Sequence, residues 1–283
     1  MTVSVYDDRV CQLGEGPLWH PVRKQLFWFD ILGKRLMTKL NGQAHHWQFD
    51  EHVSAAGWVG RDQLLIASES ELFLFDLQSG DRQSVVPLEA SNPATRSNDG
   101  RADPWGGFWI GTMGKNAEKD AGAIYRYYRG ELRQIIGPLT ITNSIAFAPD
   151  KSVAYFAETI DKCIMRQNLS KDDGWPIGDP EVFIDLSADN LNPDGSVVDG
   201  QGCLWNAQWG ASRVARYSPD GKFMSAISLP AQQTSCPAFG GSDLRTLYVT
   251  TAAIGLAGPS EGLTFQCYTE VTGQAEPCVI LGD

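Results

Sequence analysis

One polar position recurs once in each of six similar segments of the 283-residue chain. Each occupant lies five residues before a turn that contains Pro or Gly, and an apolar, strand-like run follows that turn. Carboxylate and amide oxygens are the ligands that hard divalent cations prefer. If the fold brings these positions together, the sequence predicts a metal site. The six occupants are Glu15, Ser54, Asn98, Asn143, Asp194 and Ser235.

These positions also have a purely structural interpretation. Asn, Asp and Gly are ordinary turn-forming residues, so any single occupant could serve the turn alone. Four metal-binding side chains in register across different segments favour a shared site. Glu15 and Asp194 would repel each other at close range without a cation, which further favours the metal.

The spacing of the segments indicates the fold. They repeat at intervals of about 40 to 50 residues, the period of propeller blades. We therefore expect an all-β, six-bladed β-propeller that forms a single domain over residues 1–283. The last repeat is one strand short, so residues 2–10 are predicted to form a strand that joins the last blade and closes the ring.

The composition excludes several classes of partner. The formal net charge of −11 argues against nucleic acid and anionic membrane surfaces. The N-terminus lacks the pattern of a signal peptide, and no apolar run reaches the length of a membrane span. Six scattered cysteines without a C-x-x-C pair are expected to be buried, reduced thiols of a cytoplasmic protein. The oligomeric state is left open.

Several motifs together resemble the regucalcin/gluconolactonase family. They are Leu-Gly-Glu-Gly-Pro-Leu-Trp from Leu13, Asn-Asp-Gly-Arg from Asn98, Thr-Asn-Ser-Ile-Ala-Phe from Thr142, Pro-Asp-Gly from Pro193 and Thr-Ser-Cys-Pro-Ala-Phe-Gly-Gly from Thr234. The motifs occur in order along nearly the whole chain. The resemblance implies a six-bladed propeller with one divalent metal (Ca, Zn, Mn or Mg) in its channel. It also implies hydrolysis of a sugar lactone.

The resemblance assigns roles to individual residues. Asn98 would lie beside the metal and hold a water or the substrate, and Arg96 would donate hydrogen bonds to substrate oxygens. Glu118, in a loop that varies among relatives, would be a further substrate contact. The implied metal ligands are Glu15, Asn143 and Asp194.

The same assignment suggests a mechanism. The cation would polarise the lactone carbonyl, and Asp194 would orient or deprotonate the attacking water. Two alternatives remain at this point. The chain could be a non-catalytic calcium- or partner-binding propeller, or a metal-dependent ester or organophosphate hydrolase on the same fold.

The substrate is less constrained than the reaction. Basic side chains expected near the open face would suit a lactone with an extra acidic group, beside neutral lactones. They are Arg96, Lys115, Lys119, Arg126 and His52. Trp209 is a candidate for the rim of the pocket.

Two other patterns are interpreted as structural. Strand alternation would place His45 and His46 on opposite faces, which disfavours a zinc cluster. The Gly-Pro-Ser-Glu-Gly stretch from Gly258 resembles a hydrolase nucleophile motif, but no strand and long helix flank it.

Overall fold

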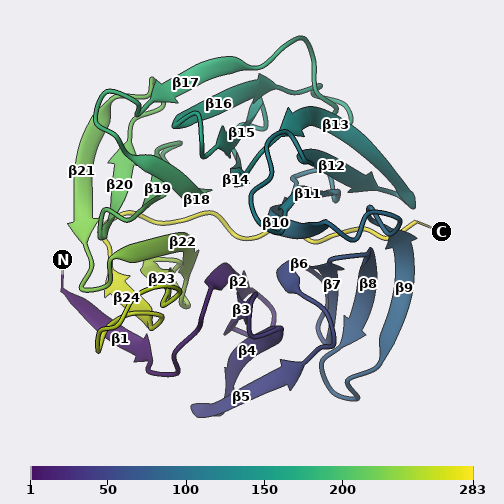
Figure 1. Cartoon of the computed structure of the whole chain (residues 1–283), viewed down its shortest axis with the longest axis horizontal. Coiled ribbons are helices and arrows are strands. Elements are labelled where there is room, and N and C mark those ends of the chain that lie inside the picture. The colour runs from purple at the N-terminus through teal and green to yellow at the C-terminus, as the bar shows by residue number, and fades with distance from the viewer. Residues whose placement is uncertain (1, 283) are drawn as a thin grey trace.

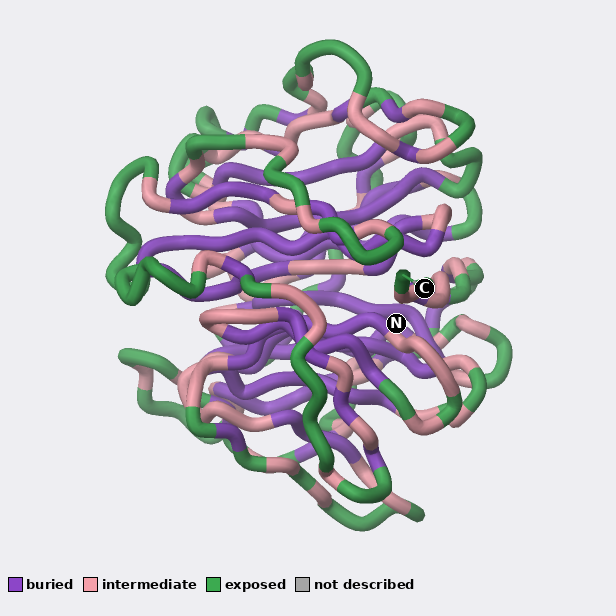
Figure 2. Tube along the Cα trace, turned by 90° about the vertical axis from the view of Figure 1, so that its right-hand side faces the viewer, coloured by how far each residue is buried: buried purple, intermediate pink, exposed green. Residues whose placement is uncertain are grey.

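Strands and turns build the entire described part of this computed structural model, residues 2–282, and no helix occurs there. Among these residues nothing helical is long and apolar enough to cross a membrane. The strands radiate around a centre (Figure 1). Buried segments run through the middle of the molecule and exposed segments gather in the loops (Figure 2).

Four separate four-stranded antiparallel sheets form blades. The first contains β2 (Gly14–His20), β3 (Gln25–Asp30), β4 (Arg35–Leu40) and β5 (Gln43–Gln48). The second contains β6 (Val53–Gly60), β7 (Gln63–Ser68), β8 (Glu71–Asp76) and β9 (Arg82–Pro87). The third contains β10 (Thr95–Ala102), β11 (Phe108–Gly114), β12 (Gly122–Tyr128) and β13 (Glu131–Leu139). The fourth contains β14 (Thr142–Phe147), β15 (Val153–Glu158), β16 (Cys163–Asn168) and β17 (Glu181–Asp185).

The expectation of a six-bladed propeller is wrong, because the remaining eight strands form one continuous sheet. Pairing between Trp209, at the end of one strand, and Gln233, at the start of another, continues the hydrogen bonding across what would be a gap between blades. The arrangement is propeller-like, with four separate blades. The strands of the large sheet are β18 (Asn192–Val198), β19 (Leu204–Trp209), β20 (Arg213–Tyr217), β21 (Phe223–Ser228), β22 (Gln233–Gly240), β23 (Thr246–Ala252), β24 (Thr264–Tyr268) and β1 (Val3–Asp7).

The innermost strands surround a central channel. In the order β2, β6, β10, β14, β18 and β22 each contacts the next, and β22 contacts β2. Apolar side chains fill the space between neighbouring sheets, as where Phe27 and Phe29 join Phe73 and Phe75 in one buried cluster. Each such side chain contributes about 1.5–3 kcal/mol when fully buried. This packing holds the inner strands, and therefore the recurring polar positions, around one axis.

The two ends of the chain attach to distant segments. β1 pairs antiparallel with β24, so the N-terminal strand is an edge of the eight-stranded sheet. The C-terminal tail, residues 270–282, crosses the ring in Figure 1 on its way from the large sheet to the third blade. It is held by Gly273, which bridges Asp199, and by the Ile280 N–H, which donates to the Gly106 carbonyl.

Local features follow the expectations in part. All six cysteines are free, although Cys163 and Cys278 are only half-buried. The stretch 171–180 is a loop between the outer strands β16 and β17, as its polar composition predicts.

Arg126 does not lie near the open face, which corrects its assignment to the substrate side. Its Nε donates to Asp103 Oδ2 at 2.7 Å, and both side chains are fully buried at the tail side of the third blade. Its guanidinium also stacks on Tyr128 and Trp175. Sequence proximity to other basic residues was misleading because Arg126 pairs with Trp109, at the opposite end of β11 from Lys115.

Asp103→Ala is expected to lower the free energy of unfolding by about 3–5 kcal/mol, because it leaves the buried Arg126 without its carboxylate. Urea-induced unfolding measures the change. Glu131→Ala is the control: the Glu131–Arg133 pair has 55% exposure on each side, so its loss should leave the unfolding transition nearly unchanged. Equal effects of the two variants would contradict the prediction.

Candidate active site

A β-bulge occurs in each innermost strand at the recurring polar position. The register shifts after Glu15 in β2, after Ser97 in β10, after Asn143 in β14 and after Pro193 in β18. Bulges re-aim side chains, which explains how strand residues turn toward the axis. Gly16 shows the local requirement: its φ is +52°, and a Cβ there would lie 2.3 Å from the Ser54 carbonyl oxygen.

Hydrogen bonds link the polar side chains of neighbouring inner strands. Asn98 Nδ2 donates to Asn143 Oδ1 at 3.0 Å and to the Thr142 carbonyl at 2.8 Å. Asn98 Oδ1 accepts a bond from Arg96 Nη1 at 2.8 Å. Asn143 Nδ2 donates to Thr159 Oγ1 at 2.9 Å, so the Asn143 oxygen is on the Asn98 side. The structure therefore brings together the amide pair and the arginine that the sequence indicated.

Asp194 is held through its main chain. Its carbonyl accepts hydrogen bonds from Ser144 Oγ and from Asn206 Nδ2, the latter at 3.0 Å. Ser144 has a φ of +61°, and Asn206 is fully buried. These hydrogen bonds run from side chains of β14 and β19 to the main chain of Asp194. They do not involve its carboxylate, which can therefore face the axis.

The electrostatics of the axis site are unbalanced. Glu15 and Asp194 are each 5% exposed, and neither forms an ion pair within residues 2–282. Burial, followed by the carboxylate of Asp99, raises the pKa of Glu15 to about 8. Burial and then Glu15 raise the pKa of Asp194 well above its ordinary value. Arg96 lowers both pKa values but does not offset the rise, so the two buried carboxyl groups need either protons or a cation.

The donor set fits a divalent cation. Glu15 and Asp194 offer carboxylate oxygens, and Asn143 adds an amide oxygen. In the channel four buried carboxyl groups, of Glu15, Asp99, Asp194 and Glu276, accompany the two guanidinium groups of Arg96 and Arg101. When all are ionised, a formal excess of two negative charges remains. Among the described residues, no three or more His, Cys, Asp or Glu are arranged so that they could hold a metal ion by themselves, so the site would need the amide oxygen of Asn143.

Arg96 has N–H groups that are available to bind a ligand. It is 6% exposed, and Nη1 is bound to Asn98 and to the Ser97 carbonyl. Within the described part of the chain, Nε and Nη2 have no hydrogen-bond partner. Burial lowers its pKa to about 10, against the effect of Glu15, so the guanidinium stays charged at neutral pH. A buried, charged and partly unpaired guanidinium is suited to bind oxygens of a ligand.

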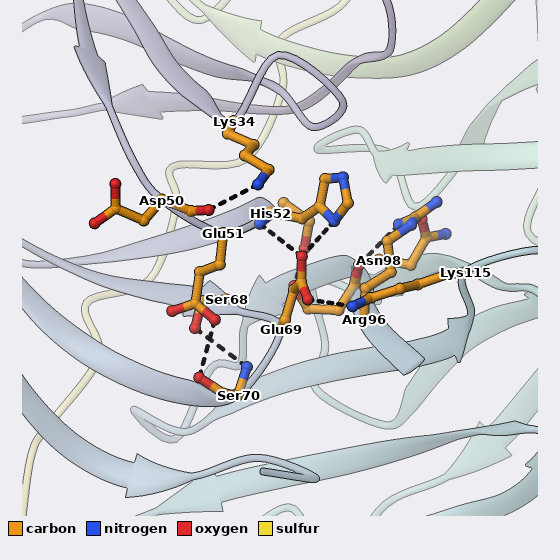
Figure 3. A network of polar contacts seen from close by, with 12 residues as sticks. Lys34, Asp50, Glu51, His52, Ser68, Glu69, Ser70, Arg96, Asn98 and Lys115 are labelled. Carbon is orange, nitrogen blue, oxygen red and sulfur yellow. Dashed lines mark hydrogen bonds and ion pairs between the residues drawn. The ribbon is translucent and has the colours of Figure 1, made fainter. Parts of the chain in front are cut away.

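A second polar group lies at the mouth of the channel, beside Arg96 (Figure 3). The Glu69 carboxylate forms an ion pair with Lys115 and accepts the His52 backbone N–H at 3.0 Å. His52 Nδ1 lies 2.5 Å from Glu69 Oε1. Burial favours a raised pKa for Glu69, but the bonds from Lys115 and His52 outweigh it and lower the pKa. Burial lowers the pKa of His52, so its ring is neutral at pH 7.

Other candidates lie apart from this group. Glu118 is exposed and accepts hydrogen bonds from Asn116 of its own loop, and no hydrogen bond or ion pair in residues 2–282 joins it to Arg96 or Asn98. Lys119 has 87% exposure and only a 4.0 Å contact with Asp120. Trp209 is half-buried and pairs with Asn192, two residues before Asp194.

The sequence did not identify the side chains that hydrogen-bond to the backbone at or near Asn143 and Asp194. Asp99 and Arg101 follow Asn98 on β10, and Asn206 lies on β19. The sequence signal was the Asn-Asp-Gly-Arg motif from Asn98, which includes Asp99 and Arg101 and places two charged residues in an otherwise buried strand. That signal identifies burial but not the partner, because each partner comes from another strand or from the tail.

The fold and the axis site define a propeller-like protein with acidic and amide side chains in a central channel. Residues 13–253 match the family described as SMP-30/Gluconolactonase/LRE-like region. The chain belongs to this family.

Similar proteins cover almost the whole chain. A 6-deoxy-6-sulfogluconolactonase of Pseudomonas putida is 35% identical over 94% of this chain and 94% of its own. An L-arabinolactonase of Azospirillum brasilense is 35% identical over 93% of this chain and 90% of its own. The crystal structure of a calcium-binding protein, regucalcin, from Agrobacterium tumefaciens superposes with a TM-score of 0.95 at 39% identity, covering 98% of this chain and 97% of that one.

Proposed function

We propose that this chain hydrolyses a sugar lactone to the open-chain sugar acid and uses one divalent metal ion held by Glu15, Asn143 and Asp194. Relatives named as lactonases, similar over nearly their full lengths, support the reaction class. The observation that supports metal dependence is the pair of buried carboxyl groups, Glu15 and Asp194, whose pKa values stay raised although Arg96 acts on both. A calcium-binding structural neighbour is consistent with it.

The bound cation would supply Lewis-acid stabilisation of the negative charge that develops on the lactone carbonyl oxygen. Asp194 would orient the attacking water and accept its proton. Arg96 Nε and Nη2 would donate to substrate oxygens, while Asn98 holds Arg96 and Asn143 in place. The water oxygen bonds to the carbonyl carbon, the ring C–O bond breaks, and the ring oxygen takes up a proton.

A pH-stat assay with a panel of aldonolactones tests this function. We expect hydrolysis by the metal-loaded protein, loss of activity after chelation, and recovery when Ca²⁺, Mn²⁺, Zn²⁺ or Mg²⁺ is added back. Metal binding without turnover of any lactone would favour a non-catalytic binding protein. Faster turnover of a phosphotriester than of any lactone would favour the ester hydrolase alternative.

The mouth of the channel favours a lactone with an additional acidic group. Arg96 has two unpaired donor groups there, Lys115 pairs with Glu69, and His52 is neutral. Charge-assisted hydrogen bonds from Arg96 would bind an anionic substituent more strongly than a neutral one.

Lys115→Met is expected to raise KM for an acidic lactone, such as a sulfonated gluconolactone, up to about fivefold, the range of a partly exposed charge pair. KM for neutral gluconolactone should stay unchanged. Initial rates with both substrates measure the difference, and Lys119→Met, in the same loop but with 87% exposure, is the control. An equal change for both lactones would contradict charge-based selection.

A further inference from the structure

Arg101 lies inside the channel beneath the axis site and binds two neighbouring strands at once. Its Nε donates to the Ile145 carbonyl of β14 at 3.1 Å. Its Nη2 donates to the Ser196 carbonyl of β18, also at 3.1 Å. Its Nη1 forms an ion pair with Glu276 of the tail, and the two side chains are 11% and 7% exposed. One guanidinium thus spans from β10 to two other inner strands and the tail.

The two carbonyls lie close in sequence to the proposed metal ligands. Ile145 is two residues after Asn143, and Ser196 is two residues after Asp194. Ile145 lies within the bulge of β14, where no ladder pairing holds its backbone. In β18 the bulge ends at Ser196, which pairs with Asn206. Asp99 Oδ2 also accepts the Ile145 N–H at 2.7 Å. Side chains of β10 therefore hold both polar backbone groups of Ile145.

The tail fixes Arg101 in turn. Trp58 Nε1 donates to the Glu276 carbonyl at 2.8 Å, and Gln274 Nε2 donates to the carbonyls of Phe147 and Val198 at 3.1 and 3.0 Å. The cavity between Asp99, Arg101 and Glu276 has a volume of about 10 Å³. That volume holds one water at most, and a second cavity of about 40 Å³ borders Arg101 and Glu276 beside the tail.

We propose that Arg101, held by Glu276, is a positioning residue that sets the backbone of β14 and β18 just past Asn143 and Asp194. It thereby fixes the spacing of these two side chains at the axis. Residues that orient ligands from behind typically affect metal affinity or activity about 10- to 100-fold. The consequence for metal and turnover rests on the proposed function, whereas the effect on the two strands does not.

Arg101→Met tests the role with three measurements. We expect Mn²⁺ affinity, measured by calorimetric titration, to fall about 10- to 100-fold. We expect kcat for lactone hydrolysis to fall at saturating metal. In the metal-free protein, amide hydrogen exchange should increase in residues 143–146 and 194–197. Glu276→Gln retains an acceptor for Arg101, so it should show the same changes to a smaller extent. It also tests the proposal if Arg101→Met does not fold.

Arg216→Met is the matched control. Arg216 is 12% exposed and pairs with the fully buried Asp199 at 2.7 Å, but it lies on β20 and contacts neither bulge. It should lower thermal stability without changing Mn²⁺ affinity or exchange at 143–146 and 194–197. Wild-type affinity and exchange in both Arg101→Met and Glu276→Gln would overturn the proposal. If wild-type protein neither binds metal nor hydrolyses lactones, the proposed function fails, and the exchange measurement still decides the positioning role.

Discussion

Replacing Asp194 by alanine is expected to reduce lactone hydrolysis by about 10²- to 10⁴-fold, the range for loss of a general base. The fold should persist, because the main chain of Asp194 is held by Ser144 and Asn206 and not through the carboxylate. Removing a buried carboxyl group that repels Glu15 should leave the metal-free protein as stable as wild type or more stable. Kinetics at saturating metal and thermal unfolding of the metal-free protein measure these effects.

Asp189→Ala is the control for this change. Asp189 is an exposed carboxylate in the loop before β18, so its loss should change neither hydrolysis nor stability. An Asp194→Ala variant that retains near wild-type hydrolysis would eliminate the assigned role. A strong loss of stability without metal would show instead that the carboxylate has a structural partner.

Deleting residues 2–10 is expected to abolish soluble folding. β1 covers the edge of β24, and an uncovered edge strand invites aggregation. Tyr6 packs edge-on against Trp28 and Tyr248, so the deletion also opens a buried aromatic cluster. Arg9 donates to the Thr38 and His45 carbonyls at 2.8 and 2.9 Å, which ties this segment to the first blade. The soluble fraction after expression and the unfolding transition of any soluble protein provide the measurement.

Substitutions within β1 show whether the deletion acts through loss of the strand itself or through loss of particular side chains. Val5 is 48% exposed on β1, so Val5→Ser should remain soluble and fold normally. Tyr6→Ala should be soluble but less stable, because it removes the aromatic contacts and keeps the strand. Full solubility and activity after deletion of residues 2–10 would refute the prediction.

The prediction of the axis residues was made from the sequence alone. Each repeat contains its own turn and strand signals, so Glu15, Asn98, Asn143 and Asp194 could be placed in register from local patterns. Once repeats pack around an axis, equivalent positions must converge. Arg96 lies beside Asn98 because the two residues are close neighbours on one strand, and its role toward the substrate stays a prediction.

Contacts between segments far apart in the chain were decided only by the tertiary structure. The pairing of Trp209 with Gln233, which merges the last strands into one sheet, depends on how two strand ends meet. Arg126 turned away from the open face because its partner Asp103 lies at the other end of the blade. Arg101 reaches Ile145, Ser196 and Glu276 only after three strands and the tail have assembled around the channel. Local periodicity determined which residues face the axis, whereas long-range packing determined what holds them there.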